Sequence, residues 1–203
     1  MKIICVGRNY ADHARELKNE VPQEPVIFIK PETAIIPKRN PFFIPDFTSD
    51  VHYEAELVVR INKLGKNIQA KFAPKYYNEV TVGIDFTARD VQKNLKEKGL
   101  PWEKAKAFDG SAAVGKFTSI AELQSPENIN FRLELNGEQR QDGHSSDMLF
   151  GVDQLIEHIS SYFTLKIGDL IFTGTPAGVG KVEKDDRLEL YLEDNKVLSL
   201  NVK

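Results

Sequence analysis

Short apolar segments, separated by turns rich in glycine, proline and asparagine, run through most of this chain. The segments with strand-like composition are residues 3–6, 25–31, 51–61, 79–86, 129–143, 168–180 and 186–202. Helical periodicity is confined to residues 9–20, 87–99 and 152–163, which lie far apart among the strands. This order predicts an α+β, mostly β architecture rather than a series of βαβ units.

Composition limits the size and the class of the protein. The chain has 203 residues, of which 41% are hydrophobic and 28% are charged, as in an ordinary globular protein with one domain or two small ones. The net charge of −3, without a basic run, argues against a nucleic-acid partner. We expect no signal peptide and no membrane partner, because no apolar run approaches the roughly 18 residues that cross a bilayer.

A single cysteine, Cys5, lies in the apolar first segment. It cannot form an internal disulfide, and we expect a buried, unreactive thiol. A cytoplasmic or organelle-matrix location fits this usage, and the cytoplasm is our expectation.

The segment "VHYEAELVVRI", residues 51–61, carries Glu54 and Glu56 within an apolar strand pattern. Side chains alternate across a strand, so both carboxylates point to the same face, with Cα atoms roughly 7 Å apart. Two explanations are possible: that face is exposed to water, or a positive group lies between the two glutamates.

Asp85 favours the second explanation. It lies where the apolar segment 79–86 meets a predicted helix over 87–99, for which Thr87 and Asp90 form a capping-box pattern and Gly99 is a stop. Three carboxylates without cysteine or histidine at ligand spacing suit Mg²⁺ or Mn²⁺, Ca²⁺ less specifically, and zinc poorly.

Other polar residues are weaker candidates, each with an ordinary explanation as a solvated surface group. Arg89 and Gln92 lie three positions apart on the predicted helix and share a face, and Lys106 follows in "PWEKAKAFD". His13 and Glu16 are also three apart, a spacing at which a carboxylate can orient an imidazole as a general base.

The loop "TGTPAGVG", residues 173–180, can present backbone N–H groups to an anion. It lacks the Gly-Lys-Ser/Thr ending of a phosphate-binding loop, which argues against nucleotide binding.

Taken in order, these and further motifs resemble the fumarylacetoacetate hydrolase family, in particular small single-domain members such as acylpyruvases and oxaloacetate decarboxylases. The motifs are "GRNYADHARE", "KPETAI", "YEAELVV", "GIDFTARDVQ", "LPWEKAKAFDG", "SSDMLFGVDQLIEHIS" and "GDLIFTGTPAGVG", and they cover about residues 3 to 200. The resemblance implies one catalytic domain over residues 1–203, a mixed, rolled β-structure with few helices, and a homodimer.

The resemblance also implies roles for individual residues. Those that it assigns are Mg²⁺ or Mn²⁺ ligands (Glu54, Glu56, Asp85), a water-activating dyad on a lid (His13, Glu16), and positions that contact a 2-oxo acid substrate (Arg89, Gln92, Lys106, Thr175). Lys106 would in addition stabilise the enolate. Two departures from the family pattern are Ala107 after Lys106, in a region that often reads Lys-Gly-Phe-Asp, and His144, where a smaller polar residue is expected.

Three functions remain open at this stage. Mg²⁺-dependent carbon–carbon hydrolysis of acylpyruvates is the preferred one, because both His13 and Glu16 are present. Decarboxylation of oxaloacetate, or tautomerisation or isomerisation of related 2-oxo acids, would use the same carboxylates. A binding protein that only kept the scaffold is disfavoured because the implied ligand and dyad positions are chemically intact.

Overall fold

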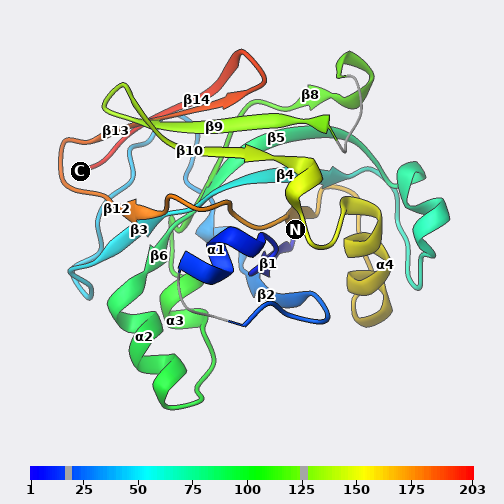
Figure 1. Ribbon diagram of the computed structural model, residues 1–203, viewed down its shortest axis with the longest axis horizontal. Helices are drawn as coiled ribbons and strands as arrows, with labels where there is room; N and C mark the ends of the chain where they lie inside the picture. The colour runs from blue at the N-terminus through cyan, green and yellow to red at the C-terminus, as the bar shows by residue number, and fades with distance from the viewer. Residues whose placement is uncertain (17–19, 124–127) are drawn as a thin grey trace.

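The computed structural model describes residues 1–16, 20–123 and 128–203, and within these ranges the strands form three sheets (Figure 1). The large sheet has the order β2 (Val26–Lys30), β1 (Ile3–Gly7), β11 (Leu170–Phe172), β4 (Ala55–Ile61), β5 (Tyr77–Asp85) and β7 (Ala112–Val114), and β8 (Thr118–Ser119) also pairs with β5. A second sheet has the order β10 (Glu138–His144), β9 (Asn130–Leu135), β13 (Arg187–Leu192) and β14 (Asn195–Asn201). The small sheet contains β12 (Gly180–Lys181), β3 (Val51–Tyr53) and β6 (Thr87–Ala88).

The helices are short and lie at the edges of this β-structure (Figure 1). The α-helices are α1 (Ala11–Glu16), α2 (Arg89–Glu97), α3 (Glu103–Lys106) and α4 (Val152–Tyr162), and the 3₁₀ turns are η1 (Glu32–Ala34), η2 (Ala70–Lys75), η3 (Ile120–Glu122) and η5 (Ser145–Asp147). No helix in the described ranges is long and apolar enough to cross a membrane. The mixed sheets with few helices confirm the predicted fold class.

The large sheet is covered on both faces, which explains its nearly continuous apolar strands. In β4, Leu57 and Val59 belong to the main core with Leu133 and Leu190 of the second sheet, whereas Val58 points to a smaller cluster with Phe172. The β1–β11 pair is parallel and its neighbouring pairs are antiparallel. Cys5 lies in the smaller cluster and is buried, as predicted.

The segment 51–61 differs from the single strand that its pattern predicts. It breaks at Glu54, so that β3 pairs within the small sheet and β4 within the large sheet. Both glutamates are buried, with 4% of Glu54 and 2% of Glu56 exposed. The explanation by a water-exposed strand face is therefore wrong.

The predicted capping box of the second helix is also wrong. Helix α2 begins at Arg89 after Ala88, and no side chain caps it. Thr87 belongs to β6 and its hydroxyl accepts a hydrogen bond from Lys106 Nζ (2.6 Å), while the Asp90 carboxylate binds Thr48 Oγ1 (2.6 Å). Tertiary partners thus replace the local cap.

The sequence signals for a hairpin turn and for the end of a helix agree with the structure. Asn136 and Gly137 have φ values of 55° and 82° and connect β9 to β10, as expected for an Asn-Gly hairpin. Gly99, with a φ of 63°, follows α2. The helix predicted over residues 9–20 is described as α1, and residues 17–19 of that prediction lie outside the described residues.

Candidate functional site

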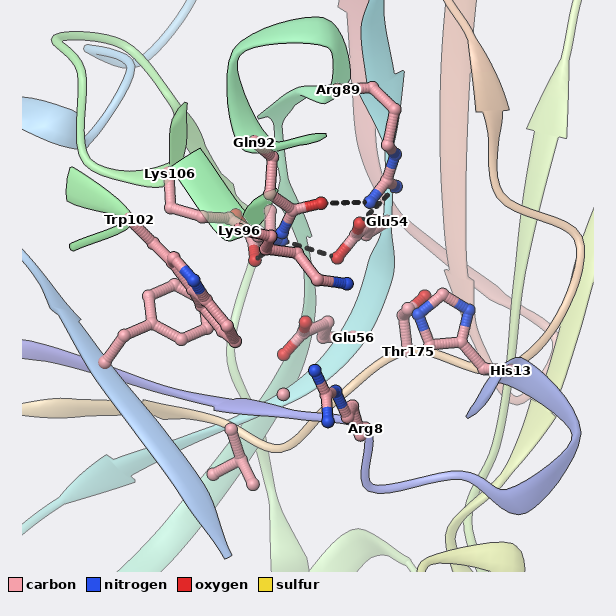
Figure 2. A pocket seen from close by; sticks show the side chains of 14 residues that line it. Arg8, His13, Glu54, Glu56, Arg89, Gln92, Lys96, Trp102, Lys106 and Thr175 are labelled. Carbon is pink, nitrogen blue, oxygen red and sulfur yellow. Dashed lines mark hydrogen bonds and ion pairs between the residues drawn. The ribbon is translucent and has the colours of Figure 1, made fainter. Parts of the chain in front are cut away.

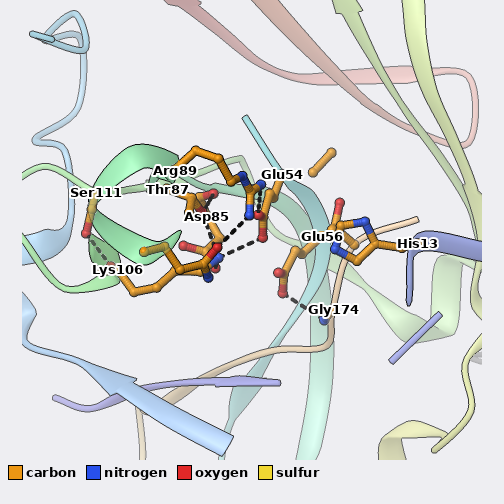
Figure 3. A network of polar contacts seen from close by, with 12 residues as sticks. His13, Glu54, Glu56, Asp85, Thr87, Arg89, Lys106, Ser111 and Gly174 are labelled. Carbon is orange, nitrogen blue, oxygen red and sulfur yellow. Dashed lines mark hydrogen bonds and ion pairs between the residues drawn. The ribbon is translucent and has the colours of Figure 1, made fainter. Parts of the chain in front are cut away.

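Three carboxylates converge where the small and the large sheets meet (Figure 3). Glu54 lies at the break between β3 and β4, Glu56 lies in β4, and Asp85 ends the neighbouring antiparallel strand β5. One oxygen from each carboxylate lies within 4.8 Å of the others, and all three residues are buried. The predicted metal ligands are thus close together in space although 31 positions separate the first from the last.

Lys106 is the central cation among these carboxylates. Its Nζ, at the end of α3, donates to Glu54 Oε2 and to Asp85 Oδ2, both at 2.7 Å. Burial favours the neutral amine, but Asp85 and Glu54 outweigh burial and raise the pKa of Lys106. The side chain therefore keeps its positive charge at neutral pH.

Arg89 is a second cation, from the first turn of α2. It donates to Glu54 Oε1 at 2.5 Å and to Gln92 Oε1 at 2.8 Å. Burial opposes ionisation of Glu54, but Lys106 and Arg89 outweigh this effect and hold the pKa of Glu54 well below its usual range. Glu54 is therefore ionised in the folded protein.

Glu56 has a different electrostatic environment. Burial, together with the nearby Asp85 carboxylate, raises the pKa of Glu56 well above its usual range. Its Oε2 accepts one hydrogen bond, from the Gly174 backbone N–H at 2.7 Å. The group thus lies in a region where another positive charge would favour its ionised form.

Asp85 provides the clearest sign that these residues fit a metal ion. Its buried Oδ1 accepts no hydrogen bond from the described residues, although Lys30 Nζ lies 2.7 Å away as an ion-pair partner. A buried carboxylate oxygen whose partner among the described residues is the Lys30 ammonium, beside two other buried carboxylates, belongs to a donor set that suits a hard divalent cation. Glu54, Glu56 and Asp85 would hold Mg²⁺ or Mn²⁺.

His13 and Glu16 approach the pocket from α1. His13 Nδ1 lies 3.4 Å from Glu16 Oε2, and Glu16 also accepts hydrogen bonds from the Gly178 backbone N–H at 3.2 and 3.3 Å. Burial lowers the pKa of His13, although Glu54 and Glu16 act in the opposite direction. The imidazole is therefore neutral at neutral pH and able to accept a proton.

The small-residue loop over 173–180 contributes differently from the anion cradle that its composition suggested. The N–H groups of Gly174 and Gly178 donate to the protein's own carboxylates, Glu56 and Glu16. Thr175 faces the pocket, and its hydroxyl accepts a hydrogen bond from Gln141 Nε2 at 2.8 Å. The loop thus positions the ligand and dyad residues.

The site residues that the sequence predicted, except Glu16, line one hollow of about 450 Å³, a volume that includes open solvent (Figure 2). The other lining residues are Val6, Gly7, Arg8, Phe28, Lys96 and Trp102. His144 is not among the lining residues and bonds to Ser146 instead.

Sequence reasoning missed several polar residues of this site: Arg8, Asn9, Lys30, Lys96 and Gln141. For Lys30 the signal was present, because a lysine within the apolar segment "VIFIK" needs a buried partner. For the other four residues no local pattern indicates a role.

The chain is similar to known proteins along almost its whole length. A sequence model described as fumarylacetoacetate (FAA) hydrolase C-terminal matches residues 2–203. "Oxaloacetate tautomerase FAHD1, mitochondrial" of Bos taurus is 42% identical over 99% of this chain and 90% of its own length, and oxaloacetate tautomerase YcgM of Escherichia coli K12 is 43% identical over 97% and 90%. A fumarylpyruvate hydrolase from Pseudomonas aeruginosa, solved with Mn²⁺ and pyruvate, superposes with a TM-score of 0.93 at 37% identity, over 100% of this chain and 89% of that one.

Proposed function

Because the chain belongs to the fumarylacetoacetate hydrolase family, as its motifs predicted, we propose that it is a divalent-metal-dependent enzyme acting on 2-oxo acids through their enolates. The observation that carries the proposal is the buried cluster of Glu54, Glu56 and Asp85 with the charged Lys106 between them. We propose that residues 1–203 act as one catalytic domain. A homodimer in the cytoplasm remains a prediction.

Oxaloacetate is the first candidate substrate, because relatives over 40% identical along nearly the whole chain are named oxaloacetate tautomerases. In the tautomerisation, a proton leaves C3 and a proton reaches the 2-oxo oxygen, so that the keto form becomes the enol. The neutral imidazole of His13 would accept the C3 proton. The charged Lys106 would stabilise the negative charge that develops on the 2-oxo oxygen.

The cation would add Lewis-acid stabilisation of the same charge and fix the orientation of the 2-oxo acid. Arg89, Gln92 and the Thr175 loop would bind the 1-carboxylate, and all three residues line the pocket. These assignments extend the roles that the family motifs imply.

Hydrolysis of an acylpyruvate is the second candidate, and the pairing of His13 with Glu16 favours it. In this reaction, His13 takes a proton from water, the hydroxide adds to the 4-oxo carbon, and the C3–C4 bond breaks. The electron pair of that bond forms the pyruvate enolate, which Lys106 would stabilise before C3 is protonated. Decarboxylation of oxaloacetate gives the same enolate without an attacking water, so it does not need His13.

The test is to compare three reactions, each with Mg²⁺ and with EDTA: loss of the oxaloacetate enol absorbance, pyruvate release from oxaloacetate, and pyruvate release from acetylpyruvate. We expect metal-dependent turnover, and we expect His13→Ala to lower tautomerisation or hydrolysis by about 10²- to 10⁴-fold. His158→Ala, on α4 and outside the pocket lining, is the matched histidine control. No metal-dependent turnover of any substrate would leave the binding-protein alternative, and full activity of His13→Ala would exclude the assigned base.

A further inference from the structure

Arg8 is a cation at the pocket that neither the metal ligands nor the dyad requires. It follows Gly7 at the end of β1, and its backbone has a φ of 60°, in the left-handed region that arginine seldom occupies. Figure 2 shows its guanidinium pointing into the hollow on the side of Glu56, away from Arg89 and Gln92. Unfavourable backbone geometry held at a pocket wall is typical of functional positions.

The next residue, Asn9, fixes this geometry. Its buried side chain donates to Thr173 O (2.7 Å) and to Phe150 O (3.0 Å), and it accepts from the Phe150 N–H (2.9 Å). The backbone before Arg8 is fixed by strand β1, and the backbone after it by these three bonds. The direction of the Arg8 Cα–Cβ bond is therefore set by the fold.

The Arg8 guanidinium has neither a hydrogen bond nor an ion pair with any of residues 1–16, 20–123 and 128–203. Lys96 lies at the same hollow, on the face of α2 that also carries Arg89 and Gln92. Burial and the nearby Arg8 and Arg89 guanidinium groups lower the pKa of Lys96. Positive charge is therefore concentrated around this hollow.

The charge balance of the pocket indicates what this wall binds. Lys106 and Arg89 already pair with the carboxylates of Glu54 and Asp85, so the Arg8 guanidinium adds positive charge beyond those pairs. A divalent cation at the carboxylates would add more. A ligand with one carboxylate would neutralise only part of this charge, whereas a dicarboxylate would place negative charge at both walls.

Phe28 and Trp102 line the same hollow, with their rings in edge contact at a centroid distance of 6.0 Å, and give it an apolar surface. We propose that Arg8 and Lys96 form a distal anion subsite that binds the second carboxylate of a dicarboxylic 2-oxo acid. This inference rests on the proposed function, to which it adds the residues that bind the distal carboxylate.

The kinetic test uses two substrates that differ only at the distal group: oxaloacetate and its 4-ethyl ester. We expect Arg8→Gln to lower kcat/KM for oxaloacetate by about 10- to 100-fold, the range for losing a charged hydrogen bond, with less than about 3-fold change for the ester. Lys96→Gln should likewise lower the preference for oxaloacetate over the ester. Arg8→Lys should restore part of it.

Lys93→Gln is the matched control, because it removes an exposed positive charge from the same helix outside the pocket lining. It should leave the ratio of the two kcat/KM values unchanged. The subsite would be overturned if Arg8→Gln and Lys96→Gln each lowered kcat/KM equally for oxaloacetate and its ester. It would also be overturned if neither variant lowered kcat/KM for oxaloacetate.

A binding measurement separates this inference from the proposed function. Calorimetry with Mg²⁺ would compare 2-oxoglutarate with 2-oxobutyrate, which lacks only the distal carboxylate. If the wild-type protein turns over neither substrate but binds the diacid more tightly, and Arg8→Gln removes that preference, the subsite stands while the proposed reaction fails. If turnover is present but the two acids bind equally well to both proteins, the subsite is refuted and the proposed function stands.

Discussion

Replacing Lys30 by methionine tests how much the buried ion pair between Lys30 and Asp85 stabilises the protein. Lys30 is completely buried, and its Nζ lies 2.7 Å from Asp85 Oδ1. The same ammonium donates to the carbonyl oxygens of Lys106 and Ser111 and to Ser111 Oγ. Methionine fills a similar volume but removes both the charge and the donors.

The expected cost follows from these contacts. Removing one partner of a buried ion pair typically costs about 3–5 kcal/mol, because the other charge and its hydrogen-bonding neighbours stay buried. We expect Lys30→Met to lower the free energy of unfolding by that amount in EDTA. For a chain of this length that corresponds to a melting temperature lower by about 6–20 °C.

Metal should offset part of this loss. A divalent cation at Glu54, Glu56 and Asp85 would replace some of the positive charge that Asp85 loses, so added Mg²⁺ should stabilise Lys30→Met more than wild type. Urea unfolding in EDTA and in Mg²⁺ measures both effects, with the m-value as a check on the unfolded state. Lys203→Met, which breaks an exposed pair with Asp185, should cause no resolvable change. A loss under about 1 kcal/mol in EDTA would refute the reasoning.

Three further predictions concern single contacts of the site. Activity that depends on His13 should persist as the pH falls to about 6.5, the ordinary imidazole pKa, and decline only below it, because burial lowers the pKa of His13; an acid limb of kcat/KM at higher pH would contradict this. Glu54→Gln should weaken Mg²⁺ binding by more than about 10-fold in calorimetry, because it removes an anionic ligand, and wild-type affinity would contradict its role. Gln141→Leu should lower the free energy of unfolding by about 1–3 kcal/mol and raise KM, because Thr175 Oγ1 and the Ala55 N–H lose their partner. Unchanged urea midpoint and KM would show that Gln141 does not position Thr175.

The sequence was informative where structure depends on neighbours in the chain. Strand periodicity, the Asn136–Gly137 turn and the stop at Gly99 follow from local backbone preferences, and the structure has all three. The carboxylates of Glu54, Glu56 and Asp85 could be grouped because each lies at a recognisable strand position. Family motifs then supplied the dyad and the substrate contacts.

Features that depend on distant partners could not be read in the same way. The break at Glu54 arises because β3 and β4 join different sheets, which a strand pattern does not encode. Thr87 bonds to Lys106 rather than capping α2, although its sequence context is that of a cap. Arg8 becomes significant only when β1 and α2 are seen to face the same hollow.

The central place of β11 in the large sheet has a consequence for synthesis of the protein. β11 lies between β1 and β4, so each of these strands has one unpaired edge until residues 170–172 have left the ribosome. Such long-range pairing slows folding, and open strand edges invite aggregation or chaperone binding in the nascent chain. A polypeptide stopped before β11 contains all three carboxylates, but the strand that joins β1 to β4 is missing, so the complete pocket forms only after translation of nearly the whole chain.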